Sequence, residues 1–179
     1  MRFKEKFGAK NGDRLTSIFG IISGWGFFLI LIVLWISPQP RFLIPFLEDV
    51  ILIVPLFNFK IPLIHLLISL PFISIGAYLG IAGVNATTLR VSETHKAVNI
   101  VDMGLYSKIR HPQYLGAILS HLGISILLSS LLSLFITPFI VLYNYVIAWK
   151  EEKELSKEFP KYYENYKKKV PMFFPRLRG

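Results

Sequence analysis

Long uncharged stretches dominate the pattern of hydrophobic and polar positions along this chain. Residues 15–36 form a run of 22 residues without a charged side chain, and residues 61–84 form another of 24 that is interrupted only by His65. A helix needs roughly 20 apolar residues to cross the hydrocarbon core of a bilayer. The pattern therefore predicts one membrane-spanning helix in each run.

A third run, residues 113–149, has 37 residues and not one charge. At about 1.5 Å of rise per residue, such a helix would be nearly two bilayer thicknesses long. We therefore expect the chain to fold back on itself here as a helical hairpin. Ser129, Ser130 and Ser133 mark the expected tip, and Pro138 suits the first turn of the returning helix.

The segment 42–57 is ambiguous, because it is apolar but carries Glu48 and Asp49 at its middle and prolines at 45 and 55. The distribution of Lys and Arg favours a segment that does not cross the membrane. In that case residues 1–14, 85–112 and 150–179 lie on one side and hold 5, 4 and 9 of these residues, which is 18 of the 20 in the chain. The positive-inside rule makes that side cytoplasmic. We expect both termini to be cytoplasmic and residues 42–57 to be interfacial or re-entrant.

These patterns predict an all-α fold, an integral membrane bundle of about four transmembrane helices. Its N-terminal part, residues 1–84, holds the first two spans. Its C-terminal part, residues 85–179, consists of a cytoplasmic loop at 85–112, the helical hairpin at 113–149 and a cytoplasmic tail at 150–179. A 28-residue loop is long for a connection, and long loops are often functional. The C-terminal part is therefore where we expect chemistry.

The tail has the pattern of an amphipathic helix. Its apolar side chains fall on one helical stripe, while lysines occupy much of the remaining surface. We expect this helix to lie on the membrane surface and to roof the site, with the lysines attracted to anionic lipid. The stripe comprises Leu155, Phe159, Tyr162 or Tyr163, Tyr166 and Val170.

Composition narrows the chemistry further. The chain is 53% apolar and 17% charged, with a net charge of +9, and it has no cysteine. The absence of cysteine excludes disulfides, thiolate metal sites, a cysteine nucleophile and lipidation of the chain's own thiols. The four histidines, His65, His95, His111 and His121, are not clustered, so we expect no metal site. Nucleic-acid binding would need a soluble basic face, which we do not expect either.

Polar residues gather where the predicted hairpin begins and ends. Arg110 and His111 precede Pro112 at its mouth, and Glu151 and Glu152 follow its returning helix. Because a hairpin brings its two ends together, these basic and acidic pairs should be neighbours at the cytoplasmic interface. Two simpler roles stay open: Arg110 forms a salt bridge that only clamps the hairpin, or it reaches lipid phosphates.

The second predicted span ends in small residues, Gly76, Gly80 and Gly83 among them. Small residues let another helix or a ligand approach the backbone closely. Helix packing is the simpler interpretation, and a contact with a cofactor is the alternative.

Two ordered blocks carry a family resemblance. Residues 100–106 and 110–116 resemble the signature LV-x-x-G-x-Y … RHP-x-Y-x-G of isoprenylcysteine carboxyl methyltransferases and related phospholipid-methyltransferase-like membrane enzymes. The similarity covers roughly residues 80 to 175 and extends to the tail, where Pro160 departs from the glycine that is usual in the family. The matching tail positions are Glu151, Glu152, Leu155, Phe159, Tyr163, Tyr166, Val170 and Pro171.

The resemblance implies a methyltransferase that uses S-adenosylmethionine and acts on a lipophilic acceptor at the cytoplasmic membrane face. That acceptor would be an isoprenylcysteine-like carboxylate or another lipid, and the protein would lie in the cell membrane if the source is prokaryotic. Arg110 and Glu152 would be catalytic, with Arg110 binding the cofactor carboxylate or orienting a carboxylate acceptor. The implied cofactor-binding residues are Gly80, Gly83, Tyr106, His111, Pro112, Tyr114, Gly116, Glu151 and Glu152.

Two other functions remain open at this stage. Membrane sterol reductases have a similar Arg-His-Pro-x-Tyr run and bind a nicotinamide cofactor, but they are much longer and their tail pattern differs. A non-catalytic, lipid-binding scaffold would use the same bundle without a cofactor. Binding of S-adenosylmethionine, of NADPH or of neither separates the three.

Overall fold

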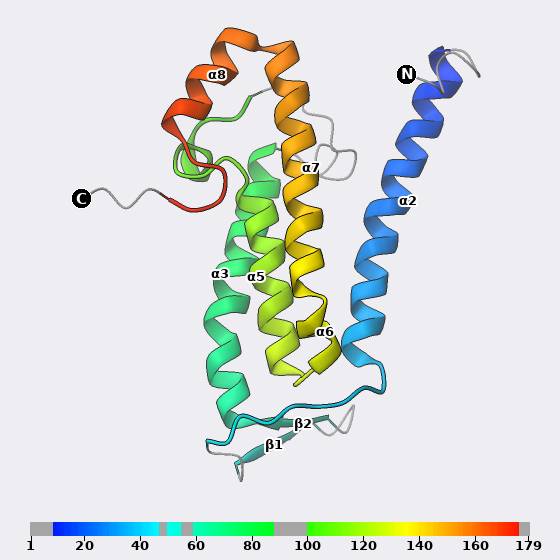
Figure 1. Cartoon of the computed structure of the whole chain (residues 1–179), viewed down its shortest axis with the longest axis vertical. Coiled ribbons are helices and arrows are strands. Elements are labelled where there is room, and N and C mark those ends of the chain that lie inside the picture. The colour runs from blue at the N-terminus through cyan, green and yellow to red at the C-terminus, as the bar shows by residue number, and fades with distance from the viewer. Residues whose placement is uncertain (1–8, 47–49, 55–58, 88–99, 176–179) are drawn as a thin grey trace.

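Three long helices run side by side through most of the length of the molecule: α3 (Leu63–Thr87), α5 (Pro112–Leu127) and α7 (Thr137–Glu158) (Figure 1). This computed structural model describes residues 9–46, 50–54, 59–87 and 100–175. The other described elements are α2 (Ala9–Ile36), β1 (Ile51–Val54), β2 (Phe59–Pro62), the 3-10 helix η1 (Gly104–Ser107), α6 (Leu131–Phe135) and α8 (Pro160–Lys169).

Glycines bring α3 and α5 into backbone contact. A β-carbon on Gly116 would lie 2.6 Å from the backbone nitrogen of Gly80 and 2.7 Å from the carbonyl oxygen of Gly76. A β-carbon on Gly83 would lie 2.6 Å from Cγ of Gln113. Small residues at such spacing allow two helices to approach closely where hydrophobic burial does not drive association. Gly76 and Gly83 of α3 therefore serve helix packing in this structure.

The chain reverses direction between α5 and α7. Ser129 adopts a positive φ of 53° in the turn, and the single helical turn of α6 follows before α7 begins. The hydroxyl-rich stretch at 129–133 thus forms the tip together with α6. Pro112 and Pro138 lie in the first turns of α5 and α7, where a missing N–H costs no hydrogen bond.

Helix α2 packs on the bundle with its C-terminal half. Leu31 and Trp35 form a buried cluster with Ile140 of α7, and the ring of Phe27 stacks on that of Tyr143 with 4.3 Å between centroids. The N-terminal half of α2 leans away from the other helices (Figure 1). The predicted first span, residues 15–36, lies within this helix.

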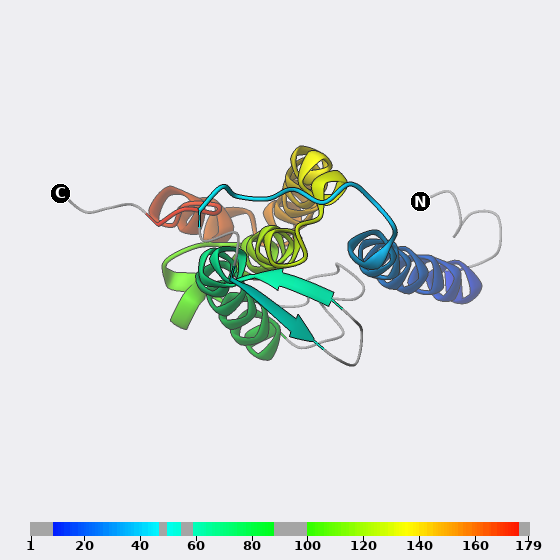
Figure 2. The ribbon, with the colours of Figure 1, turned by 90° about the horizontal axis from the view of Figure 1, so that it is seen from below.

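The expected all-α fold is wrong at one end of the bundle, because β1 and β2 form a two-stranded antiparallel sheet with Ile51 opposite Pro62. The chain runs in extended conformation from α2 beneath the helices to this sheet, as Figure 2 shows. β-Branched residues and prolines disfavour a helix there. This segment is the predicted interfacial or re-entrant stretch 42–57; its residues 47–49 and 55–57 lie outside the described residues. For the same reason α3 starts at Leu63 rather than at residue 61.

Side-chain contacts fasten this extended segment to the hairpin tip. Nη1 of Arg41 donates to the carbonyl oxygen of Leu128 at 2.9 Å and to Oγ of Ser130 at 2.8 Å. The buried His65 accepts a hydrogen bond from the backbone N–H of Ile44 at 3.2 Å. The start of α2, η1, the end of α7 and α8 lie at the opposite end of the bundle (Figure 1). The described parts of the cation-rich regions, residues 9–14, 100–112 and 150–175, thus lie toward the same end of the molecule.

Among the described residues, α3 is the one helix that is both long and apolar enough to cross a membrane, with a shorter apolar stretch at Trp25–Ile36 of α2. The outward face of α3 exposes large apolar side chains: Leu67, Leu70, Ile75, Tyr78 and Ile81.

The tail is not one continuous helix. Helix α7 continues past the predicted span to Glu158, and α8 begins at Pro160. The predicted apolar stripe is buried inside the protein, where Leu155, Tyr163, Tyr166 and Val170 form a core cluster. The apolar stripe therefore has a protein partner.

Candidate active site

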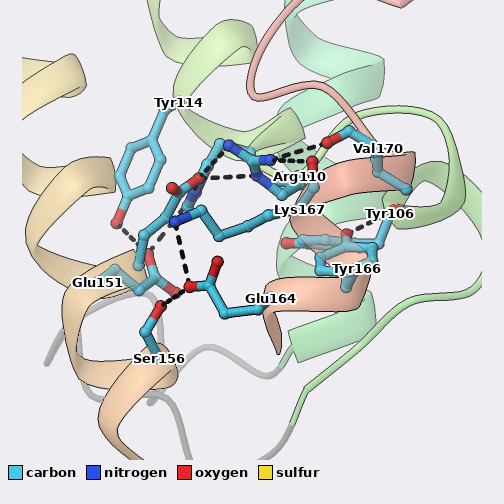
Figure 3. A network of polar contacts seen from close by, with 11 residues as sticks. Tyr106, Arg110, Tyr114, Glu151, Ser156, Glu164, Tyr166, Lys167 and Val170 are labelled. Carbon is cyan, nitrogen blue, oxygen red and sulfur yellow. Dashed lines mark hydrogen bonds and ion pairs between the residues drawn. The ribbon is translucent and has the colours of Figure 1, made fainter. Parts of the chain in front are cut away.

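The site is centred on an ion pair between the two ends of the hairpin. Nε and Nη2 of Arg110, the second residue before α5, both lie 2.8 Å from Oε1 of Glu152 in α7. The side chains of Arg110 and Glu152 are 10% and 8% exposed. The uncharged run predicts a hairpin whose two ends bring basic and acidic groups together. The structure confirms that these groups are neighbours (Figure 3).

Arg110 also holds the tail. Its Nη1 donates to the carbonyl oxygens of Lys167 at 3.1 Å and Val170 at 2.8 Å. A guanidinium has five N–H donors, and the contacts to Glu152 and these carbonyls engage four of them. Arg110 therefore links α7 to the tail, as the clamp that the sequence left open would do.

Backbone hydrogen bonds complete this attachment. The N–H of Arg110 donates to the carbonyl oxygen of Pro171 at 2.9 Å, and the N–H of His111 donates to that of Met172 at 3.1 Å. The residues that follow α8 thus run alongside the residues that precede α5. This pairing fixes the tail across the mouth of the hairpin.

His111 lies between the two glutamates. Its Nε2 is 3.1 Å from Oε1 of Glu152, so we assign the ring proton to Nε2, and its Nδ1 is 3.9 Å from Oε2 of Glu151. The hydroxyl of Tyr114 donates to the same Glu151 oxygen at 2.9 Å. Among the described residues, Oε1 of Glu151 and Oε2 of Glu152 have no hydrogen-bond partner. Each carboxylate thus keeps one oxygen available to a ligand.

Electrostatics keep Glu152 ionised. Burial raises the pKa of its carboxyl, but the hydrogen bond from His111 and the positive charge of Arg110 lower it by more. The net pKa lies below the ordinary value, so Glu152 carries its negative charge at neutral pH.

A second set of hydrogen bonds connects η1 to the helices around the site. The hydroxyl of Tyr106 donates to the carbonyl oxygen of Gly83 at 3.3 Å and accepts from Nε2 of Gln113 at 3.0 Å. The hydroxyl of Tyr166 in α8 donates to the carbonyl oxygen of Tyr106 at 2.5 Å (Figure 3). Tyr106 thereby ties η1 to α3, α5 and α8. Burial raises the pKa of its hydroxyl.

The remaining predicted residues lie close to this centre but in packing positions. Pro112 is buried at the first turn of α5. Gly83 and Gly116 are covered by the facing helix, whereas a β-carbon on Gly80 would meet nothing within 4 Å. Of the three glycines, Gly80 alone has space for a ligand beside its α-carbon. His95 lies outside the described residues.

Two aromatic residues at the site were not predicted from the sequence. The ring centroid of Phe173 lies 6.0 Å from that of His111 and 6.5 Å from that of Tyr145 in α7. The ring of Tyr114 lies 5.5 Å from His111. Tyr145 carries no sequence signal, because it is one of several aromatic residues in an uncharged run. The position of Phe173 two residues after Pro171, in a matching block, was the only available hint.

Within the described part of the chain, no group of three or more His, Cys, Asp or Glu side chains is arranged to hold a metal ion. The observed chemistry is a set of carboxylate oxygens and aromatic rings beside a buried imidazole. Such a set suits a small organic cation.

Two known proteins are similar to parts of this chain. Protein-S-isoprenylcysteine O-methyltransferase of Schizosaccharomyces pombe is 32% identical over 122 residues, which are 61% of this chain and 49% of that protein. The nickel-cobalt-cadmium resistance protein NccN of Alcaligenes xylosoxydans xylosoxydans is 36% identical over 87 residues, or 46% of this chain and 38% of that protein. The chain thus spans half or less of the length of these relatives. No solved structure matches.

The family described as phospholipid methyltransferase matches residues 63–162, which is more than half of the 179 residues. The matched region begins with α3 and ends in α8, so it contains Arg110, His111, Glu151 and Glu152. On this match the chain belongs to the phospholipid methyltransferase family.

Proposed function

We propose that this protein is an integral membrane methyltransferase that transfers a methyl group from S-adenosylmethionine to a lipophilic acceptor at the cytoplasmic face. The observation that carries the proposal is the convergence of Arg110, His111, Glu151 and Glu152 within the region of the family match. These residues come from the two ends of a hairpin and are far apart in the sequence. Their proximity is therefore a result of the fold and not of local chain connectivity.

The donor set fits the cofactor. S-adenosylmethionine carries an ammonium group, ribose hydroxyls, a carboxylate and a sulfonium. The unpartnered oxygens of Glu151 and Glu152 suit the ammonium group and the hydroxyls, since both are hydrogen-bond donors. Backbone N–H groups near the start of α5 would hold the carboxylate. His111 would position Glu152, because its Nε2 proton is already donated to that residue. Arg110 has one N–H left for the carboxylate and acts mainly by positioning Glu152 and the tail.

Methyl transfer requires the protein mainly to position the methyl donor and the acceptor. When bound, S-adenosylmethionine would supply a methyl carbon whose bond to sulfur breaks with the electron pair left on sulfur, while an acceptor oxygen or nitrogen bonds to that carbon. The residues of the chain would hold donor and acceptor in line and exclude water. The tail paired across Arg110 and His111 provides such a cover.

We place four helical spans in the bilayer: α3, α5 and the apolar parts of α2 and α7, with the span in α7 ending at Trp149. Charge distribution puts the site at the cytoplasmic face and the sheet β1–β2 at the opposite face. Trp149 and Lys153 support this boundary, because Nζ of Lys153 lies 3.6 Å from the centre of the Trp149 ring where the uncharged run ends. Trp and Lys side chains are typical of the membrane interface.

Two acceptor classes follow from the comparisons. The name of the S. pombe relative favours a prenylated cysteine carboxylate, and the family description favours a phospholipid. The deciding experiment incubates the purified protein with methyl-labelled S-adenosylmethionine and membrane lipid extract and identifies labelled products by mass spectrometry. Calorimetric titration with S-adenosylmethionine and with NADPH accompanies it. Binding of NADPH alone would establish the reductase, and binding of neither would leave a scaffold.

A further inference from the structure

We propose that Tyr114, Tyr145 and Phe173 form an aromatic cradle that binds the sulfonium of the methyl donor and so distinguishes the cationic donor from the neutral thioether product. This inference rests on the proposed function and adds to it a set of cofactor-binding residues. An aromatic ring attracts a cation over its face, and rings grouped around one point recognise quaternary ammonium groups in the same way.

The three rings come from three parts of the fold. The rings of Tyr114 and Phe173 both contact that of His111, and the ring of Tyr145 contacts that of Phe173. Tyr114 lies in α5, Tyr145 in α7 and Phe173 in the segment after α8. The ring of His111 is inclined by 39° to that of Tyr114 and by 47° to that of Phe173, and Phe173 is inclined by 43° to Tyr145. None of these three ring contacts is a flat stack.

The cradle differs from the aromatic packing elsewhere in the protein. Tyr163 and Tyr166 are buried in the cluster beneath α8, and their rings have no surface left for a ligand. Tyr145, in contrast, is 47% exposed, and Tyr114 and Phe173 are half-buried. The ring of Tyr145 therefore keeps surface that a cation can reach.

Four hydrogen bonds determine where Phe173 lies. Two come from Nη1 of Arg110 to the carbonyl oxygens of Lys167 and Val170, and two come from the N–H groups of Arg110 and His111 to the carbonyls of Pro171 and Met172. The next residue, Phe174, is 75% exposed. The same tail thus presents one phenylalanine to the site and one to the surroundings, which makes Phe174 a matched control.

Charge reinforces the preference for a cation. The hydroxyl of Tyr114 donates to Oε2 of Glu151 at 2.9 Å, and donation to a carboxylate makes a phenol ring richer in electrons. The carboxylate itself adds negative potential beside the ring of Tyr114. A sulfonium would be attracted by both, whereas a neutral thioether would gain neither attraction.

The test measures by titration calorimetry how the full-length protein in detergent binds S-adenosylmethionine and S-adenosylhomocysteine, the neutral product. We expect Phe173→Leu and Tyr145→Leu each to raise the Kd for S-adenosylmethionine about threefold to tenfold, as loss of one cation–π contact predicts. The Kd for S-adenosylhomocysteine should change less than twofold. Phe174→Leu should change neither value, and Phe173→Tyr, which keeps a ring, should restore the preference for the cation.

Equal weakening of both ligands would overturn the cradle, since it would show that the rings serve packing alone, while the proposed function would stand. Failure of the unmodified protein to bind either ligand would overturn the proposed function instead. Tyr145 is about half exposed, so Tyr145→Leu keeps the test decisive if Phe173→Leu does not fold.

Discussion

Arg110 and Glu152 are 42 residues apart in the chain, yet two guanidinium nitrogens of the arginine lie 2.8 Å from one carboxylate oxygen of the glutamate. The same arginine reaches two carbonyl oxygens of the tail. One side chain therefore joins the start of α5, the end of α7 and the residues that close the site. Its removal, or that of its partner, should disturb both the fold and ligand binding.

Glu152→Gln tests this junction. The change leaves the buried Arg110 without its counter-charge, and breaking a buried pair in this way costs about 3 kcal/mol. We expect a lower free energy of unfolding in detergent and a Kd for S-adenosylmethionine more than tenfold higher. Glu154→Gln, at an exposed position in the same helix, is the control and should change neither quantity. A Glu152→Gln protein with unchanged stability and binding would contradict the assigned site.

The pH dependence of stability should report the same carboxylate. Because the pKa of Glu152 in the folded protein lies below its ordinary value of 4.5, its ionised form stabilises the fold. That contribution is complete above pH 4.5 and is lost as the pH falls through the folded-state pKa. The difference in Tm between the unmodified protein and Glu152→Gln should therefore be constant near neutral pH and shrink below pH 4.5. A difference that grows on acidification would refute the assignment.

Glycine substitutions separate helix packing from cofactor contact. Gly116→Ala would place a methyl group 2.6 Å from the backbone of Gly80, so α3 and α5 must move apart, at a cost of about 1–3 kcal/mol. Gly80→Ala meets no atom within 4 Å and should not lower the Tm. Thermal unfolding checks both. If Gly80 faces the cofactor as the family resemblance implies, Gly80→Ala will raise the Kd for S-adenosylmethionine at unchanged stability.

Tyr166→Phe should loosen the tail. The variant removes the hydroxyl that donates to the buried carbonyl oxygen of Tyr106, and leaving such an acceptor unpaired costs about 1–2 kcal/mol. We expect faster proteolysis between α7 and α8, followed over time by mass spectrometry. Tyr78→Phe removes a hydroxyl from an exposed position of α3 and should leave the cleavage rate unchanged. Equal cleavage rates in all three proteins would show that Tyr166 does not hold the tail.

The sequence by itself determined the elements that depend on composition and length. The sequence was sufficient to place Arg110 near Glu152. The features that did so are uncharged runs long enough for helices, prolines at helix starts and a 37-residue run that must reverse direction. The sequence also separated the cationic regions from the end that holds the sheet. These features follow from local properties of the chain and from one length argument.

Only the tertiary structure decided which segments of the chain pack or pair with one another. A short apolar stretch such as residues 50–54 suits a strand or a helix equally, and pairing with β2 made it a strand. An amphipathic stripe predicts that Tyr163 and Tyr166 are buried, but it does not identify the surface that covers them. In the structure that surface belongs to the protein itself. Phe173 reaches the site through hydrogen bonds between segments about 60 residues apart. Contacts of this kind depend on the assembled bundle, because neither segment alone carries the information that positions the other.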